Sequence, residues 1–443
     1  MTTKNQIVAA VDIGTTKVVA VAGIRDEFGK INILGYGISE SKGVVRGSVQ
    51  NVSEVSAAIN NAVAKCKSTS GCDFKNIFVG IAGQNVRVEV NTHSKFIDSG
   101  IIRQADIEQL TKEVYTISKD AGEEIIHVIP QGYTVDGGKV FGNVAGCTGR
   151  KLEGKFFVAV GRANCVSAIR QAVTLSGLNI VKIILEPIAS GEAVLTEDEK
   201  EAGVLVADFG GGKTDIAVYQ QKVLKTTSYV PFGGNAITAD IQKACQLLER
   251  QAEKLKIEYG SALNLSEYSK KMAVVPGFGS TKEVLFSDLA NIINARLDEI
   301  LGGISSVLDK EDIKDSLAAG VVITGGGSKM TNILKLIKFR LPVEVRVGQI
   351  RNVLLPSENI NDPAFSSAVG LVIKGFEYLD SYRLQQQMLS SQEQKSQSQS
   401  QEKEKKSEEK EKSSAPEKKK GGFFQRLKRL ASDFLEDPDD QLK

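Results

Sequence analysis

The chain has 443 residues, of which 41% are hydrophobic and 25% charged, a balance typical of globular protein with room for about three average domains. The formal net charge is only +2, so composition does not indicate a basic, nucleic-acid-binding surface. Five cysteines without a Cys-x-x-Cys pair and only two histidines predict a reducing, cytoplasmic compartment without structural zinc. No apolar run approaches the ~20 residues of a membrane-spanning helix, and the first run is too short for a secretory signal.

Apolar runs typical of strands alternate with helical stretches from residue 6 to about residue 382, which predicts an α/β body with covered sheets. Strands are expected over residues 7–11, 17–24, 31–38, 76–82, 203–207, 215–219 and 320–323. Helices are expected over residues 52–67, 164–176, 236–256, 287–308 and 328–339.

The first candidate site is the turn between the first two predicted strands. It follows Asp12 and consists of Gly14, Thr15, Thr16 and Lys17. A tight strand-turn-strand with glycine and hydroxyl residues can direct N–H and O–H groups at phosphate oxygens, and an aspartate at the strand end can hold hydrated Mg²⁺.

A second turn repeats this pattern far along the chain. Asp208 ends a predicted strand, and the turn that follows contains Gly210, Gly211, Gly212, Lys213 and Thr214. Either turn alone also fits an ordinary glycine β-hairpin. Two together predict a duplicated body that clamps one nucleotide from both sides.

A third glycine segment follows the strand predicted at residues 320–323. Gly325, Gly326 and Gly327 form a bare-backbone turn before a predicted helix, which suits close approach by a flat ring and a sugar. The alternative is a plain connection from strand to helix. The order of the three motifs favours an adenosine site.

The end of the chain changes character twice. Residues 385–420 are mainly Gln, Ser, Lys and Glu and predict a disordered linker with a reach of roughly 35 Å. Residues 421–437 predict one amphipathic helix suited to a membrane surface. Its apolar side carries Phe423, Phe424, Leu427, Leu430, Phe434 and Leu435, and its basic residues are Arg426, Lys428 and Arg429. Docking of this helix on the body or on a protein partner is the alternative.

The order of the glycine motifs resembles the actin-like ATPase superfamily, which includes actin, heat-shock chaperones and sugar kinases. The resemblance implies an α/β fold of two lobes with a duplicated ribonuclease-H-like core, and ATP and Mg²⁺ as ligands. Residues 177–190 resemble its first connecting motif, in which an acid before proline lies near the attacking water. Glu186 would then orient that water, with Asp12 and Asp208 around Mg²⁺. Its position beside Pro187 equally fits an ordinary helix start.

Two further segments resemble this superfamily. Residues 362–371 are similar to the second connecting helix, whose small residues let the lobes pack closely. Glu253 and Lys256 stand one turn apart on the helix predicted at residues 236–256, at the spacing by which family members reach ribose and adenine. A solvated i,i+3 ion pair explains the same two residues.

An insertion in the first lobe narrows the resemblance. Residues 85–162 have their own pattern, with a helix at 107–118 and a strand at 124–135, and resemble the extra subdomain of the FtsA family of bacterial division proteins. Residues 43–49 and 230–238 also look like that family. The implied domains are first-lobe core 1–84 and 163–195, inserted subdomain 85–162, second lobe 196–384 with an outer subdomain at about 236–310, linker 385–420 and terminal helix 421–437.

The FtsA family also ends in a variable linker and a short helix on the inner membrane face. The resemblance implies an ATP-gated adaptor that polymerises, ties FtsZ filaments of the Z ring to the cytoplasmic membrane face at the division site, and helps recruit later division proteins. Polymerisation would supply avidity to a weakly binding helix. The C-terminal peptide of FtsZ is expected on the outer second-lobe subdomain, with Arg296 as a candidate contact, although an ordinary solvated helix explains Arg296 as well.

Two other functions fit the same superfold: a kinase or phosphatase, and a pilus-assembly adaptor resembling PilM, which normally lacks such a linker and terminal helix. The tail favours the division protein. One departure concerns Lys213, where family members commonly carry a hydroxyl residue. Its ammonium could contact the terminal phosphate or point to solvent, so we expect at most a weak ATPase in which nucleotide acts mainly as an assembly switch.

Overall fold

The computed structural model describes residues 6–140, 142–276, 281–310, 316–384 and 386–387. The chain divides into two compact units, residues 1–378 and 379–443, and only the first is described almost throughout. The linker predicted from residue 385, apart from residues 386–387, and the whole predicted terminal helix lie outside the described residues. Within the described part, no helix has both the length and the apolar character needed to span a membrane.

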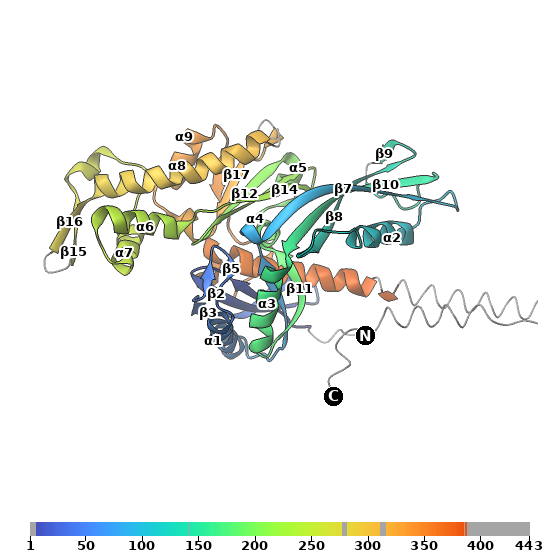
Figure 1. Ribbon diagram of the computed structural model, residues 1–443, viewed down its shortest axis with the longest axis horizontal. Helices are drawn as coiled ribbons and strands as arrows, with labels where there is room; N and C mark the ends of the chain where they lie inside the picture. Colours follow the sequence, from blue (N-terminus) through green and yellow to red (C-terminus); the bar gives the residue numbers. More distant parts are fainter. Residues whose placement is uncertain (1–5, 141, 277–280, 311–315, 385, 388–443) are drawn as a thin grey trace, which may run out of the picture. The chain divides into compact units, whose positions relative to one another are not determined.

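The first lobe is built on a six-stranded sheet of order β11-β6-β1-β2-β3-β19 (Figure 1). β1 runs antiparallel to β2 and parallel to β6. The helices α1 (Val52–Ser70) and α3 (Ala163–Leu175) pack together. α1 begins where the Asn51 side chain accepts N–H bonds from the first turn, and it ends at left-handed Gly71. The strands are β1 (Val8–Ile13), β2 (Lys17–Arg25), β3 (Ile31–Glu40), β6 (Asn76–Ile81), β11 (Asn179–Leu185) and β19 (Val353–Leu354).

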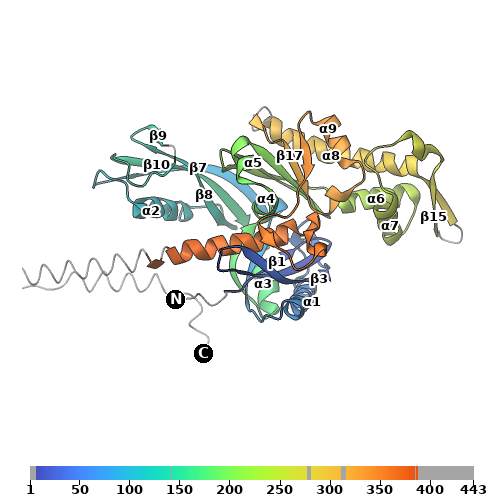
Figure 2. The ribbon, with the colours of Figure 1, turned by 180° about the vertical axis from the view of Figure 1, so that it is seen from behind.

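The second lobe repeats this arrangement in a five-stranded sheet of order β14-β13-β12-β17-β18. Figure 1 labels β12, β14 and β17 of this sheet, and Figure 2 shows the same lobe from behind. β12 is antiparallel to β13 and parallel to β17, as β1 is to β2 and β6. The duplication predicted from the two glycine turns is therefore confirmed. The strands are β12 (Val204–Phe209), β13 (Thr214–Gln220), β14 (Val223–Val230), β17 (Val321–Thr324) and β18 (Val345–Val347).

The inserted subdomain forms a separate four-stranded sheet of order β7-β10-β8-β9. Helix α2 (Gln104–Tyr115) covers one face, where Leu110 and Val114 pack in a buried cluster with Phe156 and Val158. The predicted α/β fold with an extra first-lobe subdomain is therefore confirmed. The strands are β7 (Val86–Phe96), β8 (Glu123–Val135), β9 (Gly138–Val140) and β10 (Lys151–Arg162).

The outer part of the second lobe corrects one predicted helix. The helix expected over residues 236–256 is two helices, α6 (Gly234–Cys245) and α7 (Glu249–Tyr259), because Gln246 takes a left-handed conformation with φ 52° and ends α6. Neither glycine nor proline marks this break. Helix α8 (Phe286–Lys310), the hairpin of β15 (Met272–Pro276) and β16 (Thr281–Leu285), and the short 3₁₀ helix η2 (Ser266–Lys270) complete this part.

The helix predicted over residues 328–339 is also wrong as a single element. It consists of the 3₁₀ helix η4 (Gly326–Lys329) and α9 (Ile333–Arg340), separated by Asn332 at φ 62°. Smaller elements are the hairpin β4 (Val44–Val45) and β5 (Ser48–Val49), and the 3₁₀ helices η1 (Gly83–Asn85), η5 (Glu358–Asn361) and η6 (Pro363–Phe365).

A helix between the sheets links the two lobes. α4 (Glu186–Val194) packs against β11 of the first sheet and against β12 and β13 of the second. A further helix, at residues 366–384, approaches it closely: a Cβ at Gly370 would lie 1.8 Å from the Ala189 carbonyl oxygen. Glycine is required here by space, as the resemblance to the second connecting helix implied.

Candidate nucleotide-binding site

A cavity of about 470 Å³ is lined by the glycine turns of both lobes, a size within the range of small-ligand sites. It brings together every nucleotide-site residue predicted from the sequence except Thr214. Thr214 is fully buried and donates a hydrogen bond from its hydroxyl to the Phe232 carbonyl, 2.9 Å away. The predicted residues that line the cavity are Asp12, Gly14, Thr15, Thr16, Lys17, Glu186, Asp208, Gly210, Gly211, Gly212, Lys213, Glu253, Lys256, Gly325, Gly326 and Gly327.

The two glycine turns are equivalent in register. Ile13 pairs with Val18 across the first turn, and Phe209 pairs with Thr214 across the second, so each turn has four residues and ends in lysine. The turns also face each other: a Cβ at Gly211 would lie 2.4 Å from the Thr16 methyl carbon. This closeness explains why the second turn lacks side chains where the first carries hydroxyl residues.

Half-buried carboxyl groups, Asp12 and Asp208, stand at the ends of β1 and β12. Burial, together with the charges of Glu186 and Asp208, raises the pKa of Asp12 to about 8. Burial also raises the pKa of Asp208, even though Ser190 donates a hydrogen bond to it at 2.6 Å. These carboxylates therefore resist ionisation together and gain from a nearby cation.

The surroundings of these acids fit a divalent cation beside a phosphate chain. Asp215 Oδ1 is buried without a hydrogen-bond partner in the described part of the chain, a state that bound water or an ion relieves. Asp12 and Asp208 would hold Mg²⁺ through water, and Mg²⁺ would supply charge neutralisation for phosphate oxygens. The ionisable groups that interact electrostatically around Asp12 and Asp215 include the carboxyl groups of Glu186 and Asp208 and the ammonium groups of Lys17 and Lys213.

Lys213 neither points to solvent nor lies free for a phosphate, the two positions expected from the sequence. Its ammonium donates to Glu186 at 2.8 Å and to Asp215, and its side chain is only 9% exposed. Burial alone would lower the pKa of Lys213, but the charges of these carboxylates and their hydrogen bonds raise it. Asp215 directly follows the second turn and Thr214 in the sequence, but no site role was predicted for it. Its register opposite Asp208 was the available signal.

The predicted base and ribose residues lie on α7. Lys256 donates to Glu253 at 2.7 Å, to Thr238 at 2.8 Å and to the Gly234 carbonyl at 3.0 Å. The predicted i,i+3 ion pair is therefore present on the wall of the cavity, and contact of the two residues with ribose and adenine stays a prediction. The Lys256 side chain is only 11% exposed, so the pair is mostly shielded from solvent on the lysine side. Thr238, which joins Lys256 to α6, was not predicted.

The third glycine segment closes the cavity beside the second turn. Gly325 has φ 79°, and a Cβ there would lie 2.2 Å from Asp208 Oδ1, so only glycine fits. Ser367 also lines the cavity, and its hydroxyl is buried without a hydrogen-bond partner among the described residues. Residues that sequence reasoning missed because they carry no motif include Asn235, Ile257, Leu297, Ile300 and Met330.

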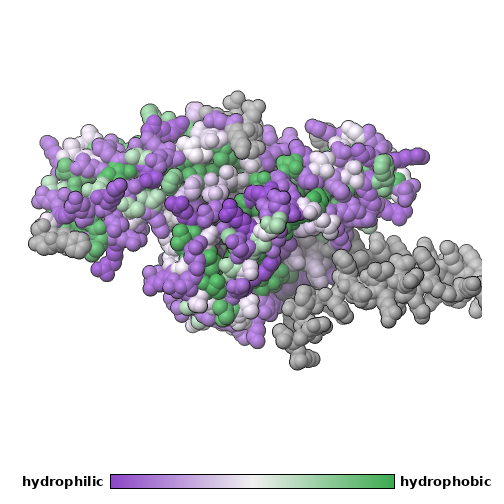
Figure 3. Space-filling view, viewed as in Figure 1, coloured by the Kyte–Doolittle hydropathy of each residue, from purple (hydrophilic) through white to green (hydrophobic). Residues whose placement is uncertain are grey.

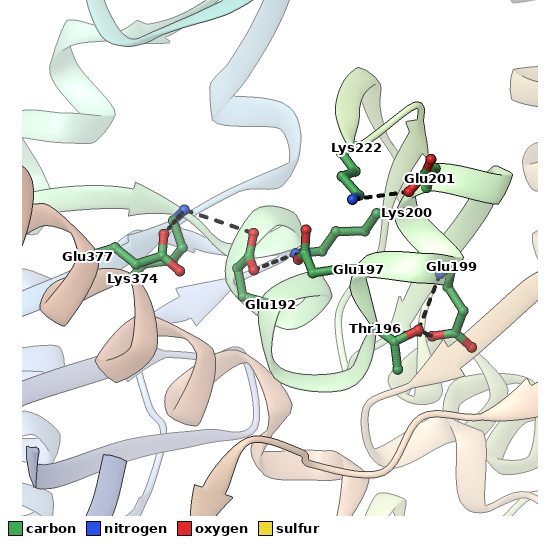
Figure 4. A network of polar contacts seen from close by, with 9 residues as sticks. All are labelled: Glu192, Thr196, Glu197, Glu199, Lys200, Glu201, Lys222, Lys374 and Glu377. Carbon is green, nitrogen blue, oxygen red and sulfur yellow. Dashed lines mark hydrogen bonds and ion pairs between the residues drawn. The ribbon is translucent and has the colours of Figure 1, made fainter. Parts of the chain in front are cut away.

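Helix α4 connects the cavity to a polar network at its other end. Glu186 lines the cavity and, with Pro187, forms the first turn of α4, so the predicted helix start is present, and the water-orienting role of Glu186 stays a prediction. Near the C-terminal end, Glu192 accepts from Lys200 at 2.6 Å, and Lys374 lies 3.9 Å from Glu192 (Figure 4). Lys200 belongs to α5 (Glu197–Ala202), and Lys374 to the helix at residues 366–384.

Arg296, the candidate partner contact, lies on α8 and away from the cavity. Its guanidinium forms two hydrogen bonds to Asp240, at 2.7 and 3.0 Å, and lies 4.7 Å from the Phe232 ring centroid. Its side chain is 19% exposed. The guanidinium of Arg296 is therefore largely occupied by contacts within the chain, and its role in partner binding stays a prediction.

Comparisons with known proteins agree with the fold and the insertion. A family model described as "Cell division protein FtsA" matches residues 205–370, and one described as "SHS2 domain inserted in FTSA" matches residues 80–160. A model of "Hsp70 protein" matches residues 163–241. The chain is 35% identical to "Cell division protein FtsA" of Neisseria meningitidis serogroup B over 375 residues, covering 84% of this chain and 91% of that protein.

Solved structures share the fold at low identity. The "PilM-PilN type IV pilus biogenesis complex" has a TM-score of 0.61 at 17% identity, covering 83% of this chain and 98% of that chain. MreB5 of Spiroplasma citri bound to ADP has a TM-score of 0.51 at 12% identity, and the match covers 85% of this chain and 97% of that chain. The chain therefore has the fold of actin-like ATPases, a class whose members bind nucleotide.

Proposed function

We propose a function that follows from the family of this chain, which belongs to the FtsA family of cell division proteins. In this function the chain binds ATP with Mg²⁺, polymerises, and ties FtsZ filaments to the cytoplasmic face of the cell membrane. Later division proteins would then be recruited to this assembly. The observation that carries the nucleotide part is the pair of facing glycine turns, each preceded by a half-buried carboxyl group at a strand end. ATP would lie between the turns, and its binding would act mainly as a switch for assembly.

We assign each group of cavity residues a part of the nucleotide to bind, according to its position. The N–H groups of the turns would hold the phosphates, Asp12 and Asp208 would hold hydrated Mg²⁺, and Glu186 would orient water. Lys256, Glu253 and the glycines at 325–327 would contact the nucleoside. The two lobes would then be fixed in one arrangement by a ligand that touches both.

Membrane attachment would come from residues 421–437. Phe423, Phe424, Leu427, Leu430, Phe434 and Leu435 would enter the acyl boundary, while Arg426, Lys428 and Arg429 meet anionic headgroups. One such helix binds reversibly, so a row of assembled copies would supply the lasting attachment.

The FtsZ peptide would bind the outer second-lobe subdomain. The β15-β16 hairpin there has one buried side, with Ala273 and Val284, and one exposed side with Met272, Val274 and Leu285. At the left of Figure 3, over the region that Figure 1 labels β15 and β16, apolar residues are visible among polar ones. This exposed apolar side, with the neighbouring helix α8 and Arg296, is the surface we would test first.

The decisive experiment is co-sedimentation of the full chain with liposomes that contain anionic lipid. We expect the full chain to sediment and to bring FtsZ filaments with it when ATP and Mg²⁺ are present, and a chain ending at Gly421 to stay in the supernatant. A full-length variant with Leu427→Gln and Leu430→Gln should also stay in the supernatant, because it keeps the linker and the net charge and loses only apolar residues of the helix. Equal sedimentation of the truncated chain would contradict membrane attachment by the terminal helix.

A further inference from the structure

The side chain of Lys213 leaves the second-lobe turn and runs between glycines of the first lobe. A Cβ at Gly47 would lie 2.6 Å from Lys213 Cε, and a Cβ at Gly83 would lie 2.8 Å from Cδ. Both glycines have positive φ, 77° and 70°. Larger residues at these two positions would meet the lysine stem, so the first lobe offers it a narrow slot.

Beyond this slot the ammonium meets Glu186 and Asp215. Glu186 is itself confined on its other side, because a Cβ at Gly80 would lie 2.7 Å from its Cγ. The Glu186 carboxylate, 14% exposed, is therefore held between the backbone of β6 and an ammonium 2.8 Å away. An ion pair this shielded holds its geometry more firmly than one in solvent.

We propose that Lys213 is a positioning residue that crosses between the lobes and restrains Glu186, so that bound ATP is retained and hydrolysed slowly. In hydrolysis, the water oxygen bonds to the γ-phosphorus, the bond from that phosphorus to the β–γ bridging oxygen breaks, and a water proton passes to a base and then to solvent. Glu186 Oε2 accepts a hydrogen bond from the Lys213 ammonium at 2.8 Å, so this oxygen is occupied and the carboxylate cannot rotate freely toward the attacking water. The inference rests on the proposed nucleotide site, and it names Lys213 as the residue that limits the rate of ATP hydrolysis there.

The contacts favour restraint of a neighbour over direct contact with phosphate. The Lys213 ammonium donates to two carboxylates, those of Glu186 and Asp215, and the lysine stem lies between Gly47 and Gly83. Lys17, in the equivalent position of the first turn, lies 4.1 Å from the Phe365 ring centroid instead. Only the second-lobe lysine therefore reaches the water-orienting acid.

The test compares Lys213→Thr, Lys213→Arg, Glu186→Gln and the Lys213→Thr/Glu186→Gln double variant in the full chain. Single-turnover ATP hydrolysis and the dissociation rate of bound nucleotide are measured for each. We expect Lys213→Thr to hydrolyse about tenfold faster, equal to about 1.4 kcal/mol in barrier, and the double variant to lose that gain. Lys213→Arg keeps the charge and should give a smaller increase. Lys271→Thr, at an exposed ion pair with Glu267 and an extended backbone position, is the matched control and should match the wild type.

An unchanged or slower rate in Lys213→Thr would overturn the proposal, and so would a gain that survives Glu186→Gln. Thermal unfolding checks that each variant folds. If Lys213→Thr does not fold, Lys213→Gln keeps most of the stem and an N–H donor without the charge, and it must itself hydrolyse faster. Absence of ATP binding by the wild type would contradict the proposed nucleotide site, whereas normal binding with equal rates would contradict only the role of Lys213.

Discussion

The two glycine turns have the same length and end in the same residue, yet their lysines meet opposite surroundings. Lys17 lies near the Phe365 ring, and burial lowers its pKa. Lys213 is held by Glu186 and Asp215, which raise its pKa in spite of burial. The register locates part of the cause: Val19 pairs with Asp12 in the first hairpin, whereas Asp215 pairs with Asp208 in the second.

The duplication has therefore preserved backbone geometry and not electrostatics. A four-residue turn between antiparallel strands can be repeated wherever its hydrogen bonds are repeated, because its shape depends little on the surrounding side chains. The charge state of a lysine depends on what lies within a few ångströms of it, and this differs between the halves. Each half consequently needs its own test.

The largest expected difference between the turns is in stability. Lys213→Met leaves Glu186 and Asp215 buried without their counter-ion and should lower the free energy of unfolding by about 3–5 kcal/mol. Lys17→Met loses a cation–π contact and should cost about 0.5–1 kcal/mol. Urea unfolding of both variants without nucleotide measures the contrast. An equal decrease in the free energy of unfolding in both variants would mean that Lys17 and Lys213 stabilise the fold equally.

The strand-end acids are expected to act alike, unlike the lysines. Asp208→Ala should weaken Mg²⁺-dependent ATP affinity by about 10- to 100-fold, and Asp12→Ala by a similar factor, because the ion would be held between them. Calorimetry with and without Mg²⁺ gives the affinities. Asp298→Ala, at an exposed ion pair with Arg340, is the matched control. Unchanged affinity in Asp208→Ala would contradict a clamp made from both turns.

Asp12 should also give stability a distinctive pH dependence. Its pKa is raised to about 8 in the folded chain, so between the ordinary carboxyl pKa and pH 8 the folded chain holds a proton that the unfolded chain has released. The stability due to Asp12 is present at low pH and is lost as pH rises toward 8, with a slope of up to about 1.4 kcal/mol per pH unit. Melting temperatures across this range should fall less steeply in Asp12→Asn. Parallel curves would contradict the raised pKa.

The smallest effect concerns the contact between the turns. Gly211→Ala should cost about 1 kcal/mol through crowding, because its Cβ would lie 2.4 Å from the Thr16 methyl carbon. Thr16→Ser removes that methyl and should recover much of the loss in the double variant. Gly14→Ala offers no such rescue, since its Cβ would meet the backbone oxygen of Lys17. Additive losses in the Thr16→Ser/Gly211→Ala pair would show that the turns are farther apart in solution.

Local patterns predicted which residues line the cavity where its geometry is local. Asp12 and Asp208 precede glycine turns in the sequence, and they stand at strand ends in the fold because strand, turn and acid are contiguous. The position of Lys213 was not predictable, since its slot comes from Gly47 and Gly83, far away in the chain. The end of α6 at Gln246 was missed because that residue takes positive φ without any glycine signal. The ion pair of Glu253 and Lys256 was predicted correctly because one helical turn brings the two side chains together, while their contact with a nucleoside stays a prediction.

The slot at Gly47 and Gly83 makes the two lobes dependent on each other's sequence. A chimaera that joined this second lobe to a first lobe with larger residues at these positions would place side-chain atoms where the lysine stem now lies. Exchange of domains between relatives should therefore succeed only when residues 47, 83 and 213 are transferred as one set, which makes them a compact marker for choosing compatible donors.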